Sequence, residues 1–463
     1  MGIDGFHQAT KAELNAKHLS AYANQRIGID ASGWLHRGTV MYSYEIITKT
    51  EPWKRDTRGV PPWIDYPLRL LALLQNNDIT PVVVFDGVSS PAKAPTSAKR
   101  RERKEAARAK GMGLIERGDH AAARKVLLGA FEVTPEMTTE LMLELKKRKM
   151  EFVVAPYEAD AQLAYMASVG SIHGIITEDS DLFAYGCEKP ILFKLCATSG
   201  TVEELSMKRL LEGHGELKGW SKEELRALCV LSGCDFLPSV KGMGFKTALK
   251  VIKKFGTRSG TETLEKTLRQ LRTMDRWKEG CTEEYCEAAS RAVEAFTHGL
   301  VYDVDRGTCV FMNEEGVCGG EEGASLELCG RRDLTHLGPR MVRGEAGLLE
   351  RVCRGEVCGR TFEPIQARPK SPGPLMSAFA LVKKKEEKVK GGIFSFVFDE
   401  RETERQKERQ KEREKEKEMG TKSGKENEAI HAVVVSPDKK KRKGSMDRFI
   451  EFWKPAGSGT SVE

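Results

Sequence analysis

Residues 173–183 read HGIITEDSDLF, a short apolar run that is followed at once by three acids. Such a run is typical of a buried strand whose carboxyl end leads into a ligand site. Four other runs have the same β-rich character: RIGID at 26–30, PVVVFD at 81–86, EFVVA at 151–155 and residues 190–194. Stretches with helical apolar spacing, such as 68–74 and 137–149, lie between them. This alternation predicts an α/β fold with a central, mostly parallel sheet flanked by helices on both faces.

The predicted strands and the helices after them deliver carboxylates to one edge of the sheet. Eight acids lie at these positions: Asp30, Asp86, Glu158, Asp160, Glu178, Asp179, Asp181 and Asp235. Two carboxylates about 4 Å apart repel by roughly 4 kcal/mol at an effective dielectric constant near 20, so such a cluster requires cations. Oxygen ligands favour Mg²⁺ or Mn²⁺, and two such ions about 3.5–4 Å apart can clamp a phosphodiester.

Each acid alone has a structural alternative. Aspartate is common at helix N-caps, and Glu158 or Asp160 could simply cap the helix that begins near Ala159. The same coincidence at five separate segments favours the interpretation that the acids share one site.

Positive charge is concentrated in one segment. The chain carries 75 basic and 68 acidic residues, a net charge of +7, and residues 93–110 contribute eight basic against two acidic side chains. A concentrated basic segment is what contact with a phosphate backbone requires, although a solvated helix face has the same composition. His36, six residues after Asp30 in a predicted helix, is either a phosphate contact or a structural histidine.

Residues 240–245 read VKGMGF and precede the amphipathic segment KTALKVIKKF. This pattern resembles a helix-hairpin-helix element. Gly242 and Gly244 would let backbone N–H groups approach a phosphate at a helix N-terminus, and Lys246 and Lys250 would add positive charge.

Composition limits the remaining classes. The chain of 463 residues has no apolar run of the roughly 18–20 residues that a membrane helix needs, and its start has no apolar signal segment. Its eleven cysteines include no CxxC pair, so they are predicted to be reduced thiols rather than zinc ligands or disulfides. Together these features predict a soluble intracellular protein.

The motif-bearing segments resemble the XPG-type 5′-nuclease family. In order they read MGI, IDASGWLHRG, VVVFDG, APYEADAQLAYM, IITEDSDLFAYGC and LSGCDFLPSVKGMG, and the resemblance extends over about residues 1–345. The sequence is most similar to the exonuclease 1 branch, because Asp160 stands where flap endonucleases usually have Glu. The segment GLVYDVDRGTCVFMN (299–313) also resembles the end of that core.

The resemblance implies a magnesium-dependent 5′→3′ exonuclease on double-stranded DNA that also cuts 5′ flaps. Seven of these acids, all except Glu178, would hold two Mg²⁺ ions, for which Mn²⁺ would substitute. Lys93 and Arg100 would reach the scissile phosphate from a helical arch. Ser232, Ser239 and the carbonyl of Met243 would hold K⁺ at the helix-hairpin-helix. The predicted DNA-binding residues are Gly2, His36, Lys93, Arg100, Arg101, Arg103, Gly242, Gly244 and Lys246.

We expect four regions along the chain. Residues 1–110 form an N-terminal nuclease region with the basic arch, 111–257 an internal nuclease region with the helix-hairpin-helix, and 258–363 a helical completion of the core. Residues 364–463 form a disordered tail, which contains the balanced charged run 400–418 and the basic run KKKRK at 439–443.

The tail implies a location and partners. KKKRK is typical of a nuclear import signal, so the expected location is the nucleus. Met446, Phe449, Phe452 and Trp453 resemble a sliding-clamp binding box. The expected substrate is duplex DNA with recessed, nicked or flapped 5′ ends, in DNA repair, recombination or mismatch repair. A monomer that associates with the sliding clamp and mismatch-repair proteins, and not with a membrane, is expected.

Two other functions stay open. One is a flap endonuclease of lagging-strand replication, and the other, less favoured because all seven acids are present, is a catalytically inactive DNA-binding scaffold. Ser32 also stands where the family usually has a tyrosine that stacks on the base beside the cleavage point. The preference between exonuclease and flap substrates therefore stays open.

Overall fold

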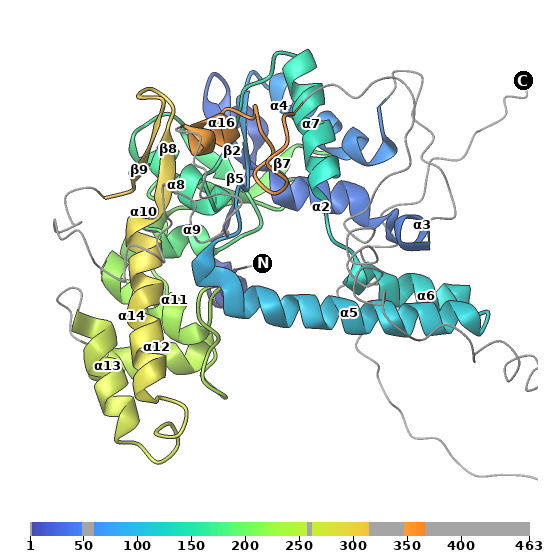
Figure 1. Cartoon of the computed structure of the whole chain (residues 1–463). Helices are drawn as coiled ribbons and strands as arrows, with labels where there is room; N and C mark the ends of the chain where they lie inside the picture. Colours follow the sequence, from blue (N-terminus) through green and yellow to red (C-terminus); the bar gives the residue numbers. More distant parts are fainter. Residues whose placement is uncertain (1, 49–59, 257–261, 314–346, 366–463) are drawn as a thin grey trace, which may run out of the picture. The chain divides into compact units, whose positions relative to one another are not determined.

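The computed structural model describes residues 2–48, 60–256, 262–313 and 347–365 (Figure 1). The chain divides into two units, Met1–Pro369 and Lys370–Glu463, and every described residue belongs to the first. The predicted disordered tail beyond residue 365, with its import signal and its clamp-binding-like box, therefore lies outside the described residues. The expected boundaries at residues 110, 257 and 363 stay predictions.

A seven-stranded sheet has the strand order β1-β7-β6-β5-β2-β3-β4. The run from β6 to β4 is parallel throughout, whereas β7 is antiparallel to β6, and β1 is antiparallel to β7. The strands are β1 (Asn15–His18), β2 (Arg26–Asp30), β3 (Thr80–Phe85), β4 (Phe152–Val154), β5 (Gly174–Ile176), β6 (Ile191–Phe193) and β7 (Thr201–Leu205). The predicted central, mostly parallel sheet flanked by helices is confirmed.

The two antiparallel strands were not expected from the sequence. The segment Thr201–Leu205 contains Glu203 and Glu204 and was not among the predicted strands. In the fold, Glu204 accepts a hydrogen bond from the Tyr22 hydroxyl (2.5 Å) and pairs with Lys17 of the neighbouring strand β1 (2.9 Å). Its charge is therefore compensated by residues far away in the sequence.

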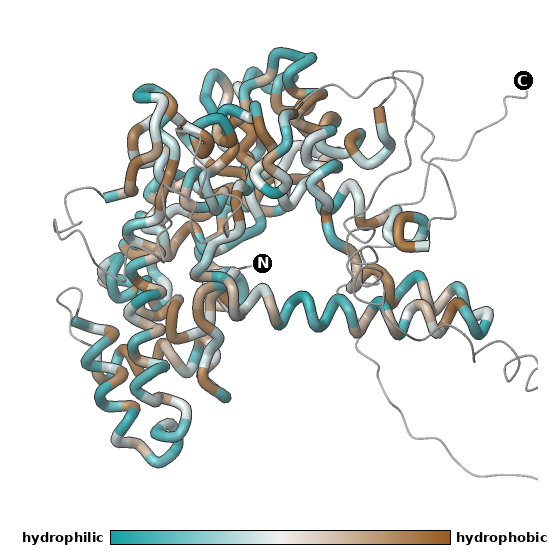
Figure 2. The backbone as a smooth tube through the Cα atoms, in the orientation of Figure 1, coloured by the Kyte–Doolittle hydropathy of each residue, from teal (hydrophilic) through white to brown (hydrophobic). Residues whose placement is uncertain are grey.

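Both faces of the sheet are buried, as the runs VVVF and GIIT predict. Val82 and Val84 of β3 belong to one hydrophobic cluster, while Val83 and Phe85 belong to another on the opposite face. Figure 2 shows hydrophobic segments gathered in the body of the unit, whereas much of α5 is hydrophilic.

Helices surround the sheet. They are α1 (Phe6–Ala9), α2 (Ala31–Val40), α3 (Ser43–Thr48), α4 (Asp65–Gln75), α5 (Ala94–Glu116), α6 (His120–Leu127), α7 (Pro135–Lys147), α8 (Ala159–Ser168), α9 (Asp181–Ala184), α10 (Met207–Glu212), α11 (Lys222–Ser232), α12 (Phe245–Phe255), α13 (Glu262–Arg272), α14 (Glu283–His298) and α16 (Leu348–Cys353). Short 3₁₀ turns occur at Lys11–Glu13, Leu19–Tyr22, Pro62–Ile64, Pro91–Lys93 and Leu128–Ala130, and β8 (Leu300–Asp303) pairs with β9 (Thr308–Phe311). Within the described residues, every helix is too short or too polar to cross a lipid bilayer.

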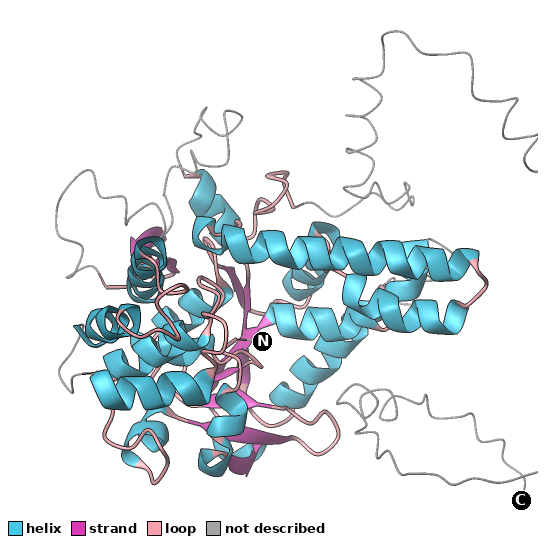
Figure 3. Ribbon diagram, turned by 90° about the horizontal axis from the view of Figure 1, so that it is seen from below, coloured by secondary structure: helices cyan, strands magenta, loops and turns pink. Residues whose placement is uncertain are grey.

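The basic segment forms most of α5, which packs against α6 as a helical hairpin (Figures 1 and 3). A side chain at Gly111 of α5 would clash with Leu127 of α6, because its Cβ would lie 2.4 Å from Cδ2. Tyr44 of α3 packs on the other side of α6, where its hydroxyl lies 2.8 Å from Nδ1 of His120 and its ring faces Arg124. We call residues 93–127 the helical arm.

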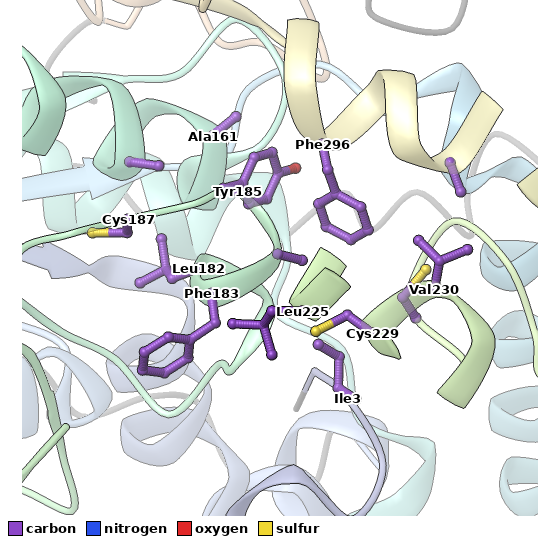
Figure 4. Packing of buried hydrophobic residues seen from close by; sticks show 14 of the residues in the cluster. Ile3, Ala161, Leu182, Phe183, Tyr185, Cys187, Leu225, Cys229, Val230 and Phe296 are labelled. Carbon is purple, nitrogen blue, oxygen red and sulfur yellow. The ribbon is translucent and has the colours of Figure 1, made fainter. Parts of the chain in front are cut away.

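Three helices pack together beyond the carboxyl edge of the sheet. Figure 4 shows Phe183 of α9 beside Leu225 of α11, and Phe296 of α14 beside Tyr185, with ring centroids 5.0 Å apart in the aromatic pair. α11 begins with a capping box in which Ser221 and Glu224 bond each other's backbone N–H groups. This packing fixes α11 and, through it, the turn to α12.

Gly87 follows Asp86, and its backbone lies close to the residues that follow β4. An added Cβ would lie 1.9 Å from the Ala155 carbonyl oxygen. We therefore expect Gly87→Ala to lower the free energy of unfolding by about 1–3 kcal/mol in urea denaturation. Gly113→Ala is the matched control, because nothing lies within 4 Å of its added Cβ in α5. It should be neutral or stabilise by up to about 1 kcal/mol. Equal effects of the two substitutions would contradict this account.

Candidate active site

The seven predicted acids come together beyond the carboxyl ends of the parallel strands. Asp30 ends β2, Asp86 follows β3, Asp179 and Asp181 follow β5, and Asp235 follows α11. Glu158 and Asp160 lie at the start of α8. Each of the seven interacts electrostatically with at least one other: Asp30 with Asp86 and Asp179, for example, and Asp181 with Asp179 and Asp235. We call these seven side chains the acid cluster.

Asp86 links three segments of the chain. Its Oδ1 accepts a hydrogen bond from the backbone N–H of Ala159 (2.9 Å), and its Oδ2 accepts one from the hydroxyl of Ser32 (2.5 Å). The alternative in which Glu158 caps α8 is wrong, because the Glu158 side chain makes no capping hydrogen bond there. The N–H group at the start of α8 is instead bonded by Asp86, which follows strand β3.

Asp30 does have the capping role that is common at strand ends. Its carboxylate accepts hydrogen bonds from the Ser32 N–H (2.9 Å) at the start of α2 and from the Thr177 hydroxyl (3.2 Å). Capping and membership of the cluster are therefore compatible in one residue.

Burial and mutual repulsion make the ionised cluster unfavourable. Burial, followed by repulsion from Asp86, raises the pKa of Asp30 to about 7. Burial together with neighbouring carboxylates also raises the pKa values of Asp160 and Asp181 well above the usual range. Asp179 and Glu158 shift in the same direction, again with burial as the largest cause.

Two basic residues at the start of the helical arm lie on the cluster. Lys93 Nζ is 2.5 Å from Glu158 Oε2 and 3.1 Å from Asp235 Oδ2, and Arg100 Nη2 is 2.5 Å from Asp235 Oδ1. Burial alone would lower the pKa of Lys93, but Glu158 and Asp235 raise it well above its usual value. Burial would raise the pKa of Asp235, but Lys93 and Arg100 lower it.

The donor atoms of the cluster fit divalent cations. Asp160 Oδ1 and Asp181 Oδ1 are buried without a hydrogen-bond partner, which is unfavourable for a carboxylate unless a cation neutralises it. In this conformation, no group of three or more His, Cys, Asp or Glu side chains of the described segments is positioned to hold an ion. Several of the oxygens instead contact Lys93, Arg100, Ser32 and backbone N–H groups, so ion binding requires those side chains to turn.

The structure also locates Glu178, the acid that the family resemblance left out of the metal ligands. Glu178 Oε1 accepts a hydrogen bond from the Lys194 N–H (2.9 Å) and pairs with Arg37 (3.1 Å). It therefore joins the end of β6 to α2.

The remaining candidates from the first part of the chain lie around this edge. Gly2 has a φ of +85°, and a Cβ there would lie 2.3 Å from Asp179 Oδ1, so only glycine fits beside the acid. His36 lies on α2 with its ring facing Phe131, and partial burial followed by Lys104 and Arg37 lowers its pKa. Arg101 and Arg103 are exposed on α5.

The predicted helix-hairpin-helix is formed by α11, the turn 233–244 and α12. Gly242, Gly244 and Lys246 are exposed, and no side chain caps the first turn of α12. Of the predicted K⁺ ligands, Ser239 is exposed, Met243 is buried, and the buried Ser232 donates its hydroxyl to the Leu228 carbonyl (2.6 Å). K⁺ binding stays a prediction.

The sequence did not predict the role of Ser32, nor the place of Tyr185. Ser32 was noted only as a missing aromatic ring, whereas its hydroxyl fixes Asp86. Tyr185 is buried near Lys93 and the acids, as the electrostatic interactions among these groups indicate. Its position four residues after Asp181, one turn of helix later, was an available signal.

Comparisons with known proteins agree with this geometry. The XPG N-terminal domain profile matches residues 1–107, and the XPG I-region profile matches residues 149–235. Exonuclease 1 of Xenopus laevis is 31% identical over 316 residues, which cover 68% of this chain and 41% of that protein. Exonuclease 1 of Drosophila melanogaster is 33% identical over 306 residues, covering 65% and 40%. The chain thus matches about two fifths of the length of these relatives.

Among solved structures, the catalytic core of Rad2 in complex with DNA substrate is 23% identical. The match covers 64% of this chain and 81% of that one, with a TM-score of 0.44.

The raised pKa of Asp30 predicts a pH dependence of stability. Unfolded Asp30 releases its proton near pH 4, whereas folded Asp30 keeps it to about pH 7. Between these values the folded state binds more protons, so stability falls as pH rises. Without divalent ions, we expect the free energy of unfolding to fall by about 1–3 kcal/mol from pH 5 to pH 8, and Asp30→Asn to flatten that slope. An unchanged slope in urea titrations of Asp30→Asn would refute the assignment.

Proposed function

We propose that this chain, which belongs to the XPG family of nucleases, is a magnesium-dependent 5′→3′ exonuclease on double-stranded DNA that also cuts 5′ flaps. The observation that carries the proposal is the acid cluster with two basic residues of the helical arm, Lys93 and Arg100, directly on it. The activity named for the exonuclease 1 relatives supports the same assignment.

The acid cluster would hold two Mg²⁺ ions, for which Mn²⁺ would substitute. Bound divalent ions supply two kinds of chemistry to phosphodiester hydrolysis, activation of water and stabilisation of charge on the leaving oxygen. The chain supplies the ligand positions. Asp86 is fixed by the Ser32 hydroxyl and the Ala159 N–H, while Asp30 is fixed by Ser32 and Thr177.

Lys93 and Arg100 would act on the scissile phosphate. Lys93 now pairs with Glu158 and Asp235, and Arg100 pairs with Asp235, so a cationic group at this place meets negative potential. A guanidinium group binds two phosphate oxygens through paired N–H donors, and a fixed cation stabilises the charge that develops during attack. Lys93 and Arg100 would leave the carboxylate oxygens and bind phosphate oxygens instead. This change of partners would orient the DNA against the acid cluster.

The remaining contacts would position the duplex. Arg101 and Arg103, which are exposed on α5, would contact the DNA backbone together with Gly2 and His36. The exposed Gly242, Gly244 and Lys246 would bind a phosphate at the hairpin. K⁺ at Ser232, Ser239 and Met243 would add to that contact. The substrates would be duplexes with recessed, nicked or flapped 5′ ends.

A flap endonuclease of lagging-strand replication is the alternative enzyme. The two differ in whether a recessed duplex end or a double flap is cut faster, so a strong flap preference with single cuts would favour the alternative. A catalytically inactive DNA-binding scaffold is disfavoured, because all seven acids of the cluster are present and Asp160 and Asp181 each bury a carboxylate oxygen that has no hydrogen-bond partner.

Partners and location follow only from residues outside the described segments. We propose nuclear import through KKKRK at 439–443, and contact with the sliding clamp through Met446, Phe449, Phe452 and Trp453. A role in DNA repair, recombination or mismatch repair, alongside mismatch-repair proteins, would follow from that placement.

Duplex DNA labelled at either the 5′ or the 3′ end tests enzyme class, polarity and ion demand together. We expect labelled mononucleotides to appear first from the 5′-labelled duplex. Their release should require Mg²⁺ or Mn²⁺ and should stop when a chelator is present. Asp179→Ala should abolish hydrolysis while DNA binding persists, since the acid touches no DNA atom in this account. Steep salt-dependent binding without hydrolysis under any of these ions would instead establish the scaffold.

Arg100→Ala tests the catalytic assignment within the helical arm. Loss of one donor to the developing charge should lower kcat by about 10²- to 10³-fold. Lys99→Ala is the matched control, because Lys99 is exposed on the same helix and has no ion pair in the described part of the chain. A change of affinity alone, or equal loss in both variants, would contradict a catalytic role for Arg100.

A further inference from the structure

A second turn packs against the hairpin of the helix-hairpin-helix. The turn connects α13 to α14, and its Gly280 lies so close to Val240 that an added Cβ would be 2.3 Å from Cγ1. Trp277 of the same turn is 3% exposed, and its ring lies under Gly242, with Cη2 3.6 Å from the place of an added Cβ. The two turns therefore form one packed unit.

Arg276 is displayed on this unit beside the hairpin. Its guanidinium stacks over the Trp277 ring, 4.6 Å from the centroid, and its Nη2 lies 3.8 Å from the place of an added Cβ at Gly242. Stacking holds the plane of the guanidinium while it leaves the N–H groups at its edge accessible.

The charge of Arg276 lacks a carboxylate partner within the described residues, unlike its neighbours. Lys278 pairs with Asp275 (2.8 Å), and Arg272 pairs with Glu283 (3.0 Å). An exposed, oriented and uncompensated guanidinium is suited to bind an external anion, and its fork of donors matches two oxygens of a phosphate.

The hairpin leaves the adjacent space open. Gly242 has a φ of +84° and no side chain, so nothing from residue 242 stands between its backbone and Arg276. Lys241 and Lys246 are exposed on the hairpin and on the uncapped first turn of α12. A phosphate group here would meet backbone N–H groups from one turn and a guanidinium from the other.

We infer that Arg276 and the hairpin together bind one backbone phosphate of duplex DNA, so that the α13–α14 turn is part of the DNA-binding surface. The inference rests on the proposed function, since it assigns to the same substrate a contact outside the acid cluster. Because a phosphate contact reads no base, its contribution should be independent of DNA sequence.

The test uses the full chain with Asp179→Ala, so that the duplex stays intact, and measures its affinity by fluorescence anisotropy across a series of KCl concentrations. Arg276→Ala should weaken binding by about tenfold at low salt and reduce the slope of log K against log [KCl] by about 0.9. Arg276→Lys should restore the slope. Lys278→Ala is the control in the same turn, and we expect no change in slope from it, because Asp275 already neutralises that charge.

Thermal unfolding of each variant separates binding from packing. If Arg276→Ala lowers the Tm and leaves the salt slope unchanged, Arg276 serves only to cover Trp277 and the inference is overturned. An equal loss of slope in Lys278→Ala would overturn it too, since the effect would then be general to positive charge. Failure of the parent protein to bind duplex at any salt would instead contradict the proposed function.

Discussion

Repulsion among buried carboxylates is the constraint on which the rest of this unit depends. Parallel strands end at a common edge, so acids that follow β2, β3 and β5 are forced together. Burial then removes the water that would screen them, and the pKa of Asp30 rises to about 7. The fold compensates with hydrogen bonds from Ser32, Thr177 and the start of α8, and with the cations of Lys93 and Arg100. The cluster persists because these donors come from every element that meets there.

Sequence patterns predicted the parts of the fold that local chemistry determines. The apolar runs that ended in acid became the parallel strands, since doubly buried strands need apolar residues on both faces. The antiparallel strands β1 and β7 escaped prediction, because Glu204 is stabilised by Tyr22 and Lys17, whose proximity is a property of the tertiary structure. The capping of α8 by Asp86 was missed for the same reason, since seventy-odd residues separate the partners along the chain.

The candidate site likewise has features that the sequence predicts and features that it does not. The identities of its acids and basic residues could be predicted from motifs, but their pairing could not, because side-chain rotation decides which oxygen meets which nitrogen. Ser32 illustrates the limit, since a sequence shows that an aromatic ring is missing and does not show that a hydroxyl now binds Asp86. Arg276 lies beyond the helix-hairpin-helix motif altogether and reaches Gly242 only because Trp277 and Gly280 pack under that turn.

The contacts of Lys93 and Arg100 couple two binding events through a single exchange of partners. While these side chains pair with Glu158 and Asp235, the carboxylate oxygens are not free for a metal ion, and the side-chain nitrogens of Lys93 and Arg100 are not free for a phosphate. A dication that takes over the carboxylates frees the two side chains for a polyanion, and a polyanion that attracts the side chains leaves the carboxylates in need of a dication. Thermodynamic reciprocity then requires each ligand to strengthen the other by the same factor. Under the proposed function, cooperativity between metal and nucleic acid would thus follow from these three ion pairs.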